Sequence, residues 1–215
     1  MHGLFITASD TGVGKTWCAT RLIHAARQRG LAVQARKPVE SGCAEGRDGL
    51  IAADGEQLAR AADSAPHRQV TPLRFRLAAA PDEAARAEGR SLRLDELEQA
   101  VRAGLDPDDF VIVEGAGGFY SPLAEDGLNA DLARRLGLPL VIVVADRLGA
   151  INQALLTCRA ARDEGLPLGA LILNETLPGE ARAQHLEALR QRVGVDVLHC
   201  PHGGEPTPYP PSLFA

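Results

Sequence analysis

The segment T-A-S-D-T-G-V-G-K-T, residues 7 to 16, decides the fold, because it joins an apolar run to a helical pattern. The run Leu4–Thr7 predicts a strand, and the apolar spacing within Thr16–Arg29 predicts a helix. A glycine-rich loop between a strand and a helix is typical of a phosphate cradle, in which backbone N–H groups and the positive helix end surround phosphate oxygens. Gly12 and Gly14 permit the close approach and unusual dihedral angles that such a loop requires.

The same loop indicates a nucleoside triphosphate as the ligand. Lys15 would neutralise the β- and γ-phosphates, and the hydroxyl of Thr16 would ligate Mg2+. The pattern G-x-x-x-x-G-K-[ST] is not fully met, because Ser9 stands where its first glycine belongs and Ala8 precedes it. The alternative is an ordinary glycine-rich turn, but the order of strand, G-V-G-K-T and helix favours a nucleotide site. The loop residues expected to contact the nucleotide are Asp10, Gly12, Val13, Gly14, Lys15 and Thr16.

Further apolar runs alternate with helical patterns, which predicts βαβ units and a mostly parallel sheet. The run L-V-I-V-V-A is apolar at consecutive positions, as expected when helices cover both faces of a sheet. We therefore expect one α/β domain of the P-loop NTPase fold over residues 1–215, with a Pro/Gly-rich tail from about residue 200. The other predicted strands are Ala32–Lys37, Phe110–Glu114, Leu140–Ala145, Leu168–Leu173 and Val195–His199.

Apolar spacing and stop signals also place the remaining helices. Ile151, Leu155 and Cys158 repeat at helical spacing before Gly165. Residues 63–91 are rich in Ala, Pro and Arg, so we expect a loop with one short helix, ordered only where packing or a ligand holds it. The other predicted helices are Leu50–Ala62, Leu94–Ala103, Ala130–Leu136 and Gly179–Arg192.

A second constellation, A-R-K-P-V-E-S-G at residues 35–42, ends a predicted strand with a lysine. Pro38 interrupts strand pairing, and the S-G pair then turns the chain. Ligands of doubly wound sheets collect at the carboxyl ends of strands, so Lys37 would face the same crevice as Lys15. Two ammonium groups there could stabilise charge on a transferring phosphoryl group and on a carboxylate-like acceptor. Taken alone, Lys37 could equally be a surface lysine.

A third constellation, F-V-I-V-E-G-A-G-G at residues 110–118, is a buried strand that ends in an acid and a glycine-rich turn. Glu114 is placed to ligate Mg2+, directly or through water, because this ion prefers oxygen ligands beside phosphates. Asp54 is a candidate second carboxylate, although an isolated acid is more often solvated. The turn glycines could let backbone N–H groups reach a substrate; they are Gly115, Gly117 and Gly118.

Several polar residues later in the chain invite functional interpretations. The amide of Asn174 could pair with a nucleobase, and the absence of the guanine-reading N-K-x-D favours adenine. Asp146 is better explained as a helix cap or a surface charge than as a metal ligand. The H-C-P-H run at residues 199–202 lacks a second ligand pair, which disfavours a metal site there. His24 and His185 fall in predicted helices and are most simply surface or packing residues.

Composition disfavours several classes of protein. Apolar residues make up 45% and charged residues 24%, as in globular chains. A net charge of -5 without a sustained basic stripe argues against nucleic acid or an anionic membrane as the partner. We see no leader pattern and no apolar run of membrane-spanning length, which predicts a cytoplasmic location. The dispersed cysteines are expected to be reduced and mainly structural; they are Cys18, Cys43, Cys158 and Cys200.

Four motifs in order, D-T-G-V-G-K-T, K-P-V-E-S-G, V-E-G-A-G-G and L-G-A-I-N-Q-A-L-L-T, resemble the dethiobiotin synthetase family over residues 3 to about 175. Each motif is modestly specific, whereas the ordered set is highly specific. The resemblance implies a homodimer of P-loop α/β subunits, with the active site near the subunit interface, that uses ATP, Mg2+ and CO2 on 7,8-diaminononanoate. The implied reaction closes a cyclic urea through a carbamate and a carbamic-phosphoric anhydride.

The resemblance also implies roles for individual residues. The residues that handle the phosphates and the carbamate are Lys15, Lys37 and Thr11. The implied substrate contacts are Ser41, Gly117, Gly118 and, from across the dimer interface, Asn152. The implied Mg2+ environment is Thr16, Asp54 and Glu114, and the implied adenine contacts are Asn174 and Pro201. The departures from the family pattern are Ala8 in place of glycine, Ala80-Pro81-Asp82 in place of S-P-H, and His185 in place of a substrate-contacting tyrosine of some relatives.

Two other functions fit part of the pattern. A nucleotide-switch ATPase of the partition or septum-positioning type would resemble K-G-G-V-G-K-T, with an additional lysine where this chain has Asp10. An amidotransferase-type synthetase acting on a corrinoid precursor would require a glutaminase domain, for which 215 residues leave no room. The ordered motifs therefore favour the synthetase that makes a cyclic urea.

Overall fold

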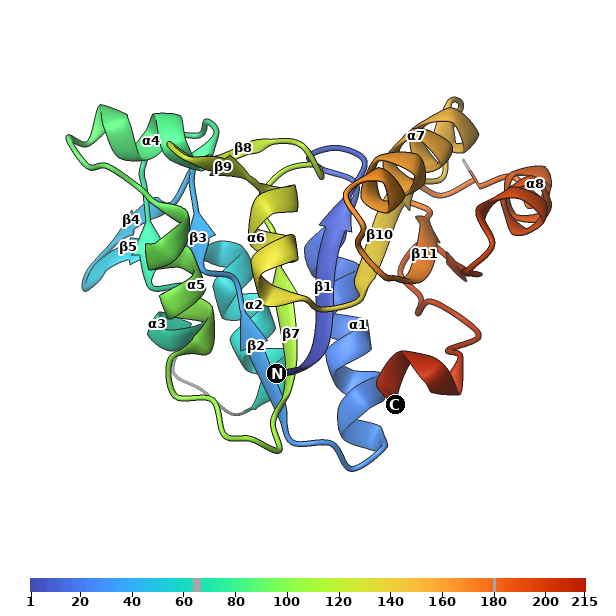
Figure 1. Cartoon of the computed structure of the whole chain (residues 1–215), viewed down its shortest axis with the longest axis horizontal. Helices are drawn as coiled ribbons and strands as arrows, with labels where there is room; N and C mark the ends of the chain where they lie inside the picture. Colours follow the sequence, from blue (N-terminus) through green and yellow to red (C-terminus); the bar gives the residue numbers. More distant parts are fainter. Residues whose placement is uncertain (64–66, 180) are drawn as a thin grey trace.

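The computed structural model describes residues 1–63, 67–179 and 181–215, in which strands and helices alternate along the chain (Figure 1). The strands are β1 (His2–Ala8), β2 (Val33–Arg36), β3 (Val39–Glu40), β4 (Ala44–Gly46), β5 (Gly49–Ile51), β6 (Leu73–Arg74), β7 (Phe110–Glu114), β8 (Pro122–Ala124), β9 (Gly127–Leu128), β10 (Leu140–Ala145), β11 (Leu168–Asn174) and β12 (Asp196–Cys200). The helices are α1 (Lys15–Gln28), α2 (Ala53–Ala62), α3 (His67–Val70), α4 (Pro81–Ala87), α5 (Leu94–Arg102), α6 (Asn129–Leu136), α7 (Ala150–Asp163), α8 (Ala183–Val193) and the 3-10 helix η1 (Pro211–Phe214).

The central sheet contains six parallel strands in the order β12-β11-β10-β1-β7-β2. Strand β1 lies between β10 and β7, with Ile6 opposite Val141 on one side and Glu114 on the other. Strands are therefore added on both sides of β1. In sheets of this type the ligand binds at the carboxyl ends of the strands near the point where the strand order reverses. The expected P-loop α/β fold with a mostly parallel sheet is confirmed.

Helices cover both faces of this sheet, as Figure 1 shows. Leu4 and Ile6 of β1 belong to the apolar cluster that contains α1 and α2. Phe5, between them, belongs to the cluster of the opposite face, which contains α5, α6 and α7. Successive side chains of a strand point to opposite faces, so a strand covered on both faces is apolar at every position. All six residues of β10 are buried, which explains the uninterrupted run L-V-I-V-V-A.

The region 63–91 carries more structure than the sequence predicts. In place of a loop with one short helix, its described part contains α3, β6 and α4. Leu73 and Arg74 of β6 pair in parallel with Val39 and Glu40 of β3. Phe75 is fully buried, so packing orders this region. Two-residue strands have no periodicity of their own, and only the distant partner β3 defines β6 as a strand.

Helix α2 begins at Ala53, three residues after the predicted start. The residues before it form β5, which pairs with β4 in an antiparallel hairpin, with Leu50 opposite Glu45. Leu50 therefore belongs to a strand, although it extends the apolar pattern of the helix. Helix α8 likewise begins at Ala183, after the predicted start at Gly179.

The tail after β12 is packed at its end. Thr207 forms an antiparallel bridge with His199, and the chain then reaches η1. Leu213 and Phe214 are buried in the cluster of α1 and α2, so this end of the tail contributes to the core. The free thiols expected from the sequence are present and buried; they are Cys18, Cys43, Cys158 and Cys200.

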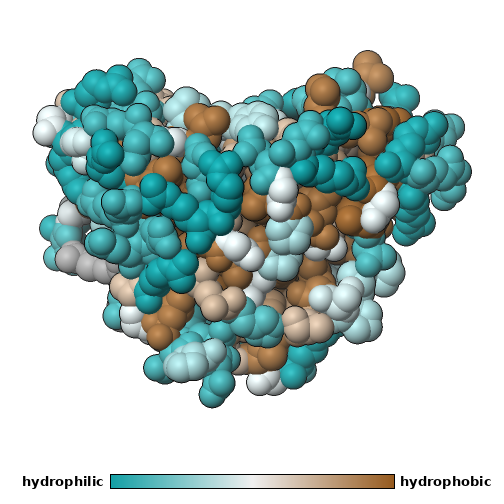
Figure 2. Space-filling model, in the orientation of Figure 1, coloured by the Kyte–Doolittle hydropathy of each residue, from teal (hydrophilic) through white to brown (hydrophobic). Residues whose placement is uncertain are grey.

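The surface of the molecule is polar over α4 and α5, and apolar residues gather near α7 (Figure 2). Across the described residues, no helix is long and apolar enough to span a membrane.

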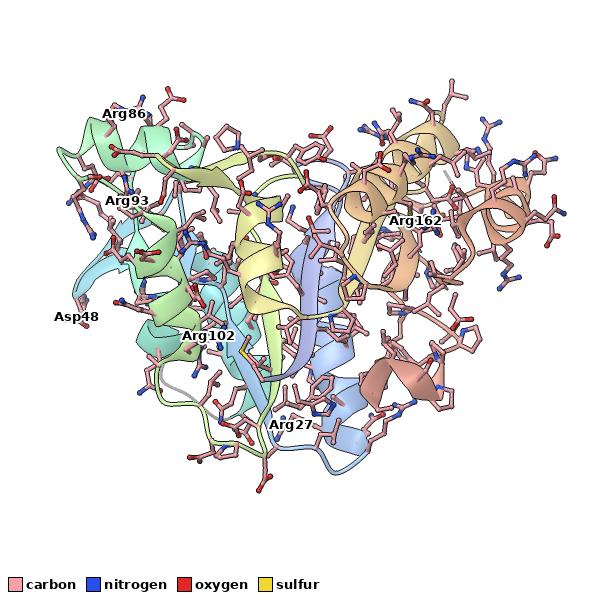
Figure 3. All side chains as sticks on the ribbon, viewed as in Figure 1. Arg27, Asp48, Arg86, Arg93, Arg102 and Arg162 are labelled. Atoms are coloured by element: carbon pink, nitrogen blue, oxygen red, sulfur yellow. The ribbon has the colours of Figure 1, made fainter. Side chains whose placement is uncertain are left out.

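The labelled arginines of Figure 3 come from separate elements, and four of them pair with nearby carboxylates. These pairs are Arg27–Asp63, Arg86–Asp82, Arg93–Asp126 and Arg102–Glu98.

Gly3 is required where β1 passes β7. Its φ is +149°, and a Cβ atom there would stand 1.8 Å from the carbonyl oxygen of Val111. We expect Gly3→Ala to lower the free energy of unfolding by about 2–3 kcal/mol, because the strands would have to move apart. Gly30→Ala is the matched control: its φ is +82° but nothing lies within 4 Å, so about 1 kcal/mol is expected. Equal losses in urea unfolding would contradict the proposed clash.

Candidate active site

A cavity of about 370 Å3 opens at the carboxyl ends of β1, β2 and β7. The loop after β1, Lys37 after β2 and Glu114 at the end of β7 all reach it. The chain contains two lysines in all, and both line this cavity, as the strand arrangement predicts. The complete lining is Thr11, Gly12, Gly14, Lys15, Thr16, Lys37, Glu40, Ser41, Asp54, Glu114, Ala116 and Gly117.

Lys37 is held between two carboxylates. Its Nζ atom lies 2.5 Å from Oδ2 of Asp54 and 2.7 Å from Oε1 of Glu114. Burial alone would lower the pKa of Lys37, but the carboxylates of Glu114 and Asp54 outweigh it and hold that pKa above its ordinary value. Burial likewise opposes ionisation of Asp54, yet Lys37 holds the pKa of Asp54 below its ordinary value. The two pairs therefore keep Lys37 and Asp54 ionised in this cavity.

Glu114 connects the phosphate loop to Lys37. Its side chain is fully buried, and its Oε1 accepts hydrogen bonds from Oγ1 of Thr16 at 2.9 Å and from Nζ of Lys37. Its other oxygen, Oε2, is buried and has no hydrogen-bond partner among the residues that the structure describes. A buried oxygen of this kind normally has a partner, so Oε2 is a candidate ligand atom for a cation or its bound water.

The loop 9–14 has the backbone of a phosphate cradle. Gly12 and Gly14 have positive φ values of 74° and 88°, and α1 begins at the next residue. Ala8 is the last residue of β1 and pairs with Val143, so this position is extended and needs no glycine. Alanine in place of the family's glycine at position 8 is therefore compatible with the end of β1.

Lys15 begins α1 and is buried. Its Nζ atom lies 3.4 Å from the backbone oxygen of Asp10, and burial lowers its pKa. The carboxylate of Asp10 accepts the backbone N–H of Thr11 at 2.7 Å, which shapes the start of the loop. Lys15 therefore has no carboxylate within ion-pairing distance in the described part of the chain, in contrast to Lys37.

The charges of the cavity suit a magnesium nucleotide. The carboxylates of Glu40, Asp54 and Glu114 face two ammonium groups, which leaves one formal negative charge. A triphosphate alone would be repelled by this excess, whereas a divalent cation reverses its sign. The oxygen donors of Thr16, Asp54 and Glu114 are of the type that Mg2+ prefers. Outside residues 64–66 and 180, no group of three His, Cys, Asp or Glu side chains is placed to hold a metal ion.

The glycine-rich turn after β7 is fixed by Asn129 at the start of α6. The side-chain oxygen of Asn129 accepts the N–H of Ala116 at 3.0 Å, and its Nδ2 donates to the backbone oxygens of Ala116, Gly118 and Ser121. The expectation that three glycine N–H groups of this turn face a substrate is too broad. The N–H of Gly115 donates to Ile6, and that of Gly118 donates to Ser121 Oγ at 2.8 Å. Of the three glycines, Gly117 lines the cavity.

Ser41 lies at the rim of the cavity and joins it to the region before α4. Its hydroxyl donates to the backbone oxygen of Ala79 at 2.6 Å. The segment Ala80-Pro81-Asp82 follows directly, and Pro81 begins α4. Asp82 pairs with Arg86, four residues later in α4, so its carboxylate forms an ion pair within the helix.

A second cavity of about 370 Å3 shares Gly12 and Gly14 with the first. At their junction, Nδ2 of Asn174 donates to the backbone oxygen of Val13 at 2.9 Å, which ties the end of β11 to the phosphate loop. Gly14 has no space for a side chain, because a Cβ atom would stand 2.1 Å from Nδ2 of Asn174. The other lining residues are Trp17, Asn174, Glu175, Thr176, His202 and Gly203. Pro201 precedes His202 of this lining, and its backbone oxygen accepts the N–H of Gly204 at 2.9 Å.

Asp146 and His185 form a buried pair at the end of β10. Nδ1 of His185 lies 2.6 Å from Oδ1 of Asp146, and Oδ2 accepts the N–H of Arg182, which precedes α8. Asp146 is 1% exposed, so the surface position considered for it is wrong. Its carboxylate instead fixes the start of α8 against the sheet. His185 is buried, in agreement with a packing role.

Asn152 lies outside both cavities, exposed on α7. Large apolar side chains are exposed on the same helix and just before it, with Leu156 63% exposed and Leu148 85% exposed. This apolar surface near α7 is visible in Figure 2. Asn152 therefore lines neither of the two cavities at the phosphate loop.

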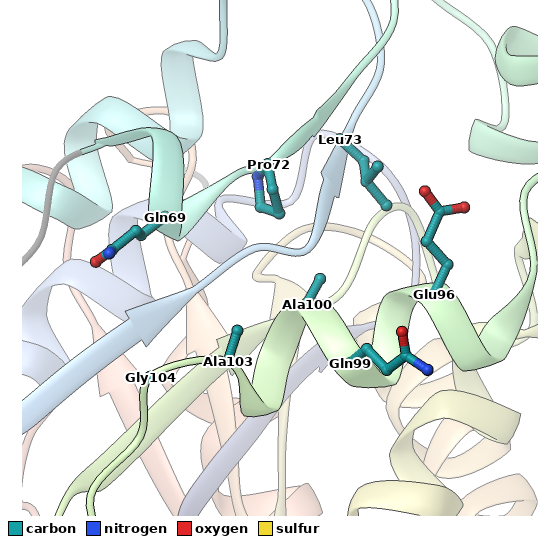
Figure 4. A pocket seen from close by; sticks show the side chains of 8 residues that line it. All are labelled: Gln69, Pro72, Leu73, Glu96, Gln99, Ala100, Ala103 and Gly104. Atoms are coloured by element: carbon teal, nitrogen blue, oxygen red, sulfur yellow. The ribbon is translucent and has the colours of Figure 1, made fainter.

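A larger cavity of about 480 Å3 lies between α5 and the segment 69–73 (Figure 4). It shares no lining residue with the cavity that holds the lysines. Glu96 is its one ionisable lining residue in the described chain, and that carboxylate pairs with Arg90 at 2.7 Å. This cavity is therefore larger than the cavity that holds Lys15 and Lys37, but it lacks the cluster of charged side chains found there.

Sequence reasoning missed two side chains that shape the lysine cavity. Asn129 stands immediately before the predicted helix at Ala130, where a capping residue is expected, and that signal could have found it. Glu40 lies within the quoted K-P-V-E-S-G motif, yet its partners are the backbone N–H groups of Asp54 and Gly55. No local sequence pattern predicts that a carboxylate will accept backbone N–H groups from a helix further along the chain.

Known proteins resemble this chain at the level of sequence and fold. The family model described as "AAA domain" matches residues 2–200. An ATP-dependent dethiobiotin synthetase BioD from Pseudomonas paraeruginosa is 43% identical over 201 residues, which cover 92% of this chain and 88% of that protein. Proteins of the same name from Cellvibrio japonicus and Ruthia magnifica are 43% and 39% identical, and the matches cover 90% and 92% of this chain and 86% and 90% of theirs.

Solved structures support the fold alone. The signal recognition particle receptor FtsY from Elizabethkingia anophelis in complex with GDP has a TM-score of 0.52 and 18% identity, covering all of this chain and 62% of that chain. The cell division protein FtsY from Thermotoga maritima has a TM-score of 0.52 and 16% identity, covering 99% of this chain and 66% of that chain. The present chain thus spans about two thirds of these structural neighbours.

Removing Lys37 alone would leave Glu114 buried without its counter-ion. We expect Lys37→Ala to lower the free energy of unfolding by about 3–5 kcal/mol in the absence of nucleotide and Mg2+. The double variant Lys37→Ala/Glu114→Gln also removes the unpaired negative charge of Glu114. It should therefore recover part of the lost free energy of unfolding. Urea unfolding of both variants checks this, and a double variant no more stable than Lys37→Ala would contradict it.

Proposed function

The chain belongs to the dethiobiotin synthetase family, a family of ATP-dependent ligases, and on that premise we propose the reaction that its own residues perform. We propose that it carboxylates 7,8-diaminononanoate with CO2 and closes the ring to dethiobiotin, releasing ADP and phosphate. The observation that carries this proposal is the meeting of Lys15 and Lys37 in one cavity beside the phosphate loop. Their ammonium groups suit a reaction in which negative charge moves between a phosphate and a carbamate.

The proposed chemistry has three steps. One amine of the substrate attacks CO2 and forms a carbamate, with loss of a proton from nitrogen. A carbamate oxygen then attacks the γ-phosphorus of ATP, which forms the carbamic-phosphoric anhydride and releases ADP. The second amine attacks the carbamoyl carbon and loses a proton, which closes the urea ring and releases phosphate. Phosphoryl transfer of this kind requires positioning and charge stabilisation, so we assign no covalent nucleophile.

Lys37 must leave its carboxylate partners to act on the phosphate. Its ammonium group is bound to Asp54 and Glu114 at 2.5 and 2.7 Å. Unpairing the buried carboxylate of Glu114 is unfavourable unless another cation takes the place of the lysine. A second counter-ion beside those carboxylates would leave the ammonium group of Lys37 able to bind the γ-phosphate oxygens. Lys15 and Thr11, which line the same cavity, would bind the phosphate oxygens.

The residues that would hold Mg2+ are Thr16, Asp54 and Glu114, and the ion would neutralise charge on the β- and γ-phosphates. Oε2 of Glu114 supports this assignment, because Glu114 lines the cavity and this buried oxygen has no hydrogen-bond partner among the described residues. Nucleotide binding is assigned to the loop residues Asp10, Gly12, Val13, Gly14, Lys15 and Thr16. The second cavity suits the nucleoside, with Asn174 in its lining and Pro201 beside it.

The diamine would lie against Ser41, Gly117 and Gly118, and a second copy of the chain would complete its site. Asn152 is exposed on α7, away from its own cavity. It lies among exposed apolar residues, which supports a homodimer that buries this face and presents Asn152 to the partner's substrate. The use of ATP is consistent with the cytoplasmic location expected from the sequence. The nucleotide-switch alternative gains no support, because Asp10 occupies the place of its additional lysine.

Product analysis tests the proposed function directly. Incubation with ATP, Mg2+, bicarbonate and 7,8-diaminononanoate is expected to yield the ureido product, detected by mass spectrometry. Lys37→Ala should lower its rate of formation by about 100-fold or more, through lost stabilisation of the transition state. Saturating Mg2+ and ATP keep a counter-ion near Glu114, so nucleotide binding should persist in this variant.

Lys15→Ala is the contrasting variant, because loss of the P-loop lysine should abolish nucleotide binding itself. Unchanged product formation by Lys37→Ala would overturn the catalytic assignment. Absence of the ureido product from the unaltered protein, together with ATP hydrolysis stimulated by a partner protein, would overturn the proposed reaction.

A further inference from the structure

Glu40 is a buried carboxylate of the lysine cavity that the proposed chemistry does not use. It is 8% exposed. Its Oε1 accepts the backbone N–H of Asp54 at 3.1 Å, and its Oε2 accepts the backbone N–H of Gly55 at 3.0 Å. Both oxygens therefore accept hydrogen bonds from the backbone at the start of α2.

The start of α2 has no cap of its own. The first N–H groups of a helix have no partner within the helix, and a polar side chain at the N-cap usually accepts one of them. The N-cap here is Ala52, which makes no side-chain hydrogen bond. Glu40 supplies the missing acceptors from β3, and its negative charge is favourable at the positive end of the helix.

This cap also fixes the backbone next to a cavity carboxylate. Gly55 packs so closely that a Cβ atom would stand 2.2 Å from Oγ1 of Thr71. The side chain of Asp54 is 38% exposed, so packing around it leaves it room to move. Its ion pair with Lys37 at 2.5 Å therefore depends on where the capped backbone places it.

We propose that Glu40 is a positioning residue, which caps α2 from β3 and thereby holds the carboxylate of Asp54 beside Lys37 and Glu114. The inference rests on the proposed role of Asp54 as a ligand of Mg2+. Glu40 would act through the backbone of α2, because both of its carboxylate oxygens accept N–H groups there. Loss of the cap would displace Asp54, disturb Lys37 and weaken binding of the magnesium nucleotide.

The small number of lysines allows a direct measurement of this effect. Protein labelled with 13C and 15N in lysine alone gives signals from two side chains, those of Lys15 and Lys37. We expect Glu40→Ala to shift the ε signals of Lys37 clearly and those of Lys15 less, because Nζ of Lys37 pairs with Asp54 whereas Nζ of Lys15 donates to the backbone oxygen of Asp10. Unmoved Lys37 signals in a folded variant would overturn the proposal.

A double-mutant cycle separates positioning through Asp54 from a direct role of Glu40. ADP binding is measured by calorimetry over a range of Mg2+ concentrations for the unaltered protein, Glu40→Ala, Asp54→Asn and the double variant. Glu40→Ala is expected to raise the Mg2+ concentration for half-maximal binding about tenfold, and to add little in the Asp54→Asn background. Additive effects would mean that Glu40 acts independently of Asp54, and would overturn the proposal.

Two further variants keep the test interpretable. Glu56→Ala removes another carboxylate from the first turn of α2, one that pairs weakly with Arg60 at 3.9 Å, and should change neither measurement. If Glu40→Ala fails to fold, Glu40→Gln keeps the side-chain volume and one acceptor oxygen and should give a smaller shift in the same direction. Neither measurement needs the diamine, so a missing ureido product would defeat the proposed function while leaving this inference standing.

Discussion

The ion pairs of Lys37 with Asp54 and Glu114 are the interaction on which the site depends. Ions buried in this way are tolerated only where each has a close and well-oriented partner. The sheet holds the partners in place. Arg36 of β2 pairs with Val113 of β7, which places Lys37 and Glu114 next to each other just beyond the last paired residues. Glu114 then receives the hydroxyl of Thr16 from α1. The register of β2 and β7 therefore brings Lys37 and Glu114 together, and Thr16 joins them to the phosphate loop.

The parts of this arrangement that the sequence predicts are those that local patterns encode. The buried strands Phe110–Glu114 and Leu140–Ala145 have the expected bounds, because both faces of the sheet are covered and every position must be apolar. The phosphate loop is recognisable because its glycines are required by backbone conformation at Gly12 and Gly14. The convergence of Lys15 and Lys37 follows from parallel topology alone, since both residues follow strands that end at one edge.

The remainder depends on contacts between distant residues. β6 exists only through its pairing with β3, and α2 starts late because Leu50 joins a hairpin. Asp146 looks like a surface acid until the fold supplies His185 as its partner. A carboxylate such as Glu40 carries no sign of the backbone groups that it will accept from residues 14 and 15 positions later. Local spacing specifies the elements, whereas tertiary structure alone specifies these partners.

The choice of lysine at position 37 has a physical reason that its neighbour makes clear. The chain contains 21 arginines and two lysines, so a buried cation would by default be an arginine. Arg36, one residue earlier, is fixed by hydrogen bonds to the backbone oxygens of Val101 and Ala103. Such a planar fork suits a permanent anchor. Lys37 has a compact ammonium on a flexible stem, which can exchange carboxylate oxygens for phosphate oxygens without moving the strand. Arg36, the last residue of β2, thus fixes the strand, whereas Lys37, which follows it, can change its charged partner.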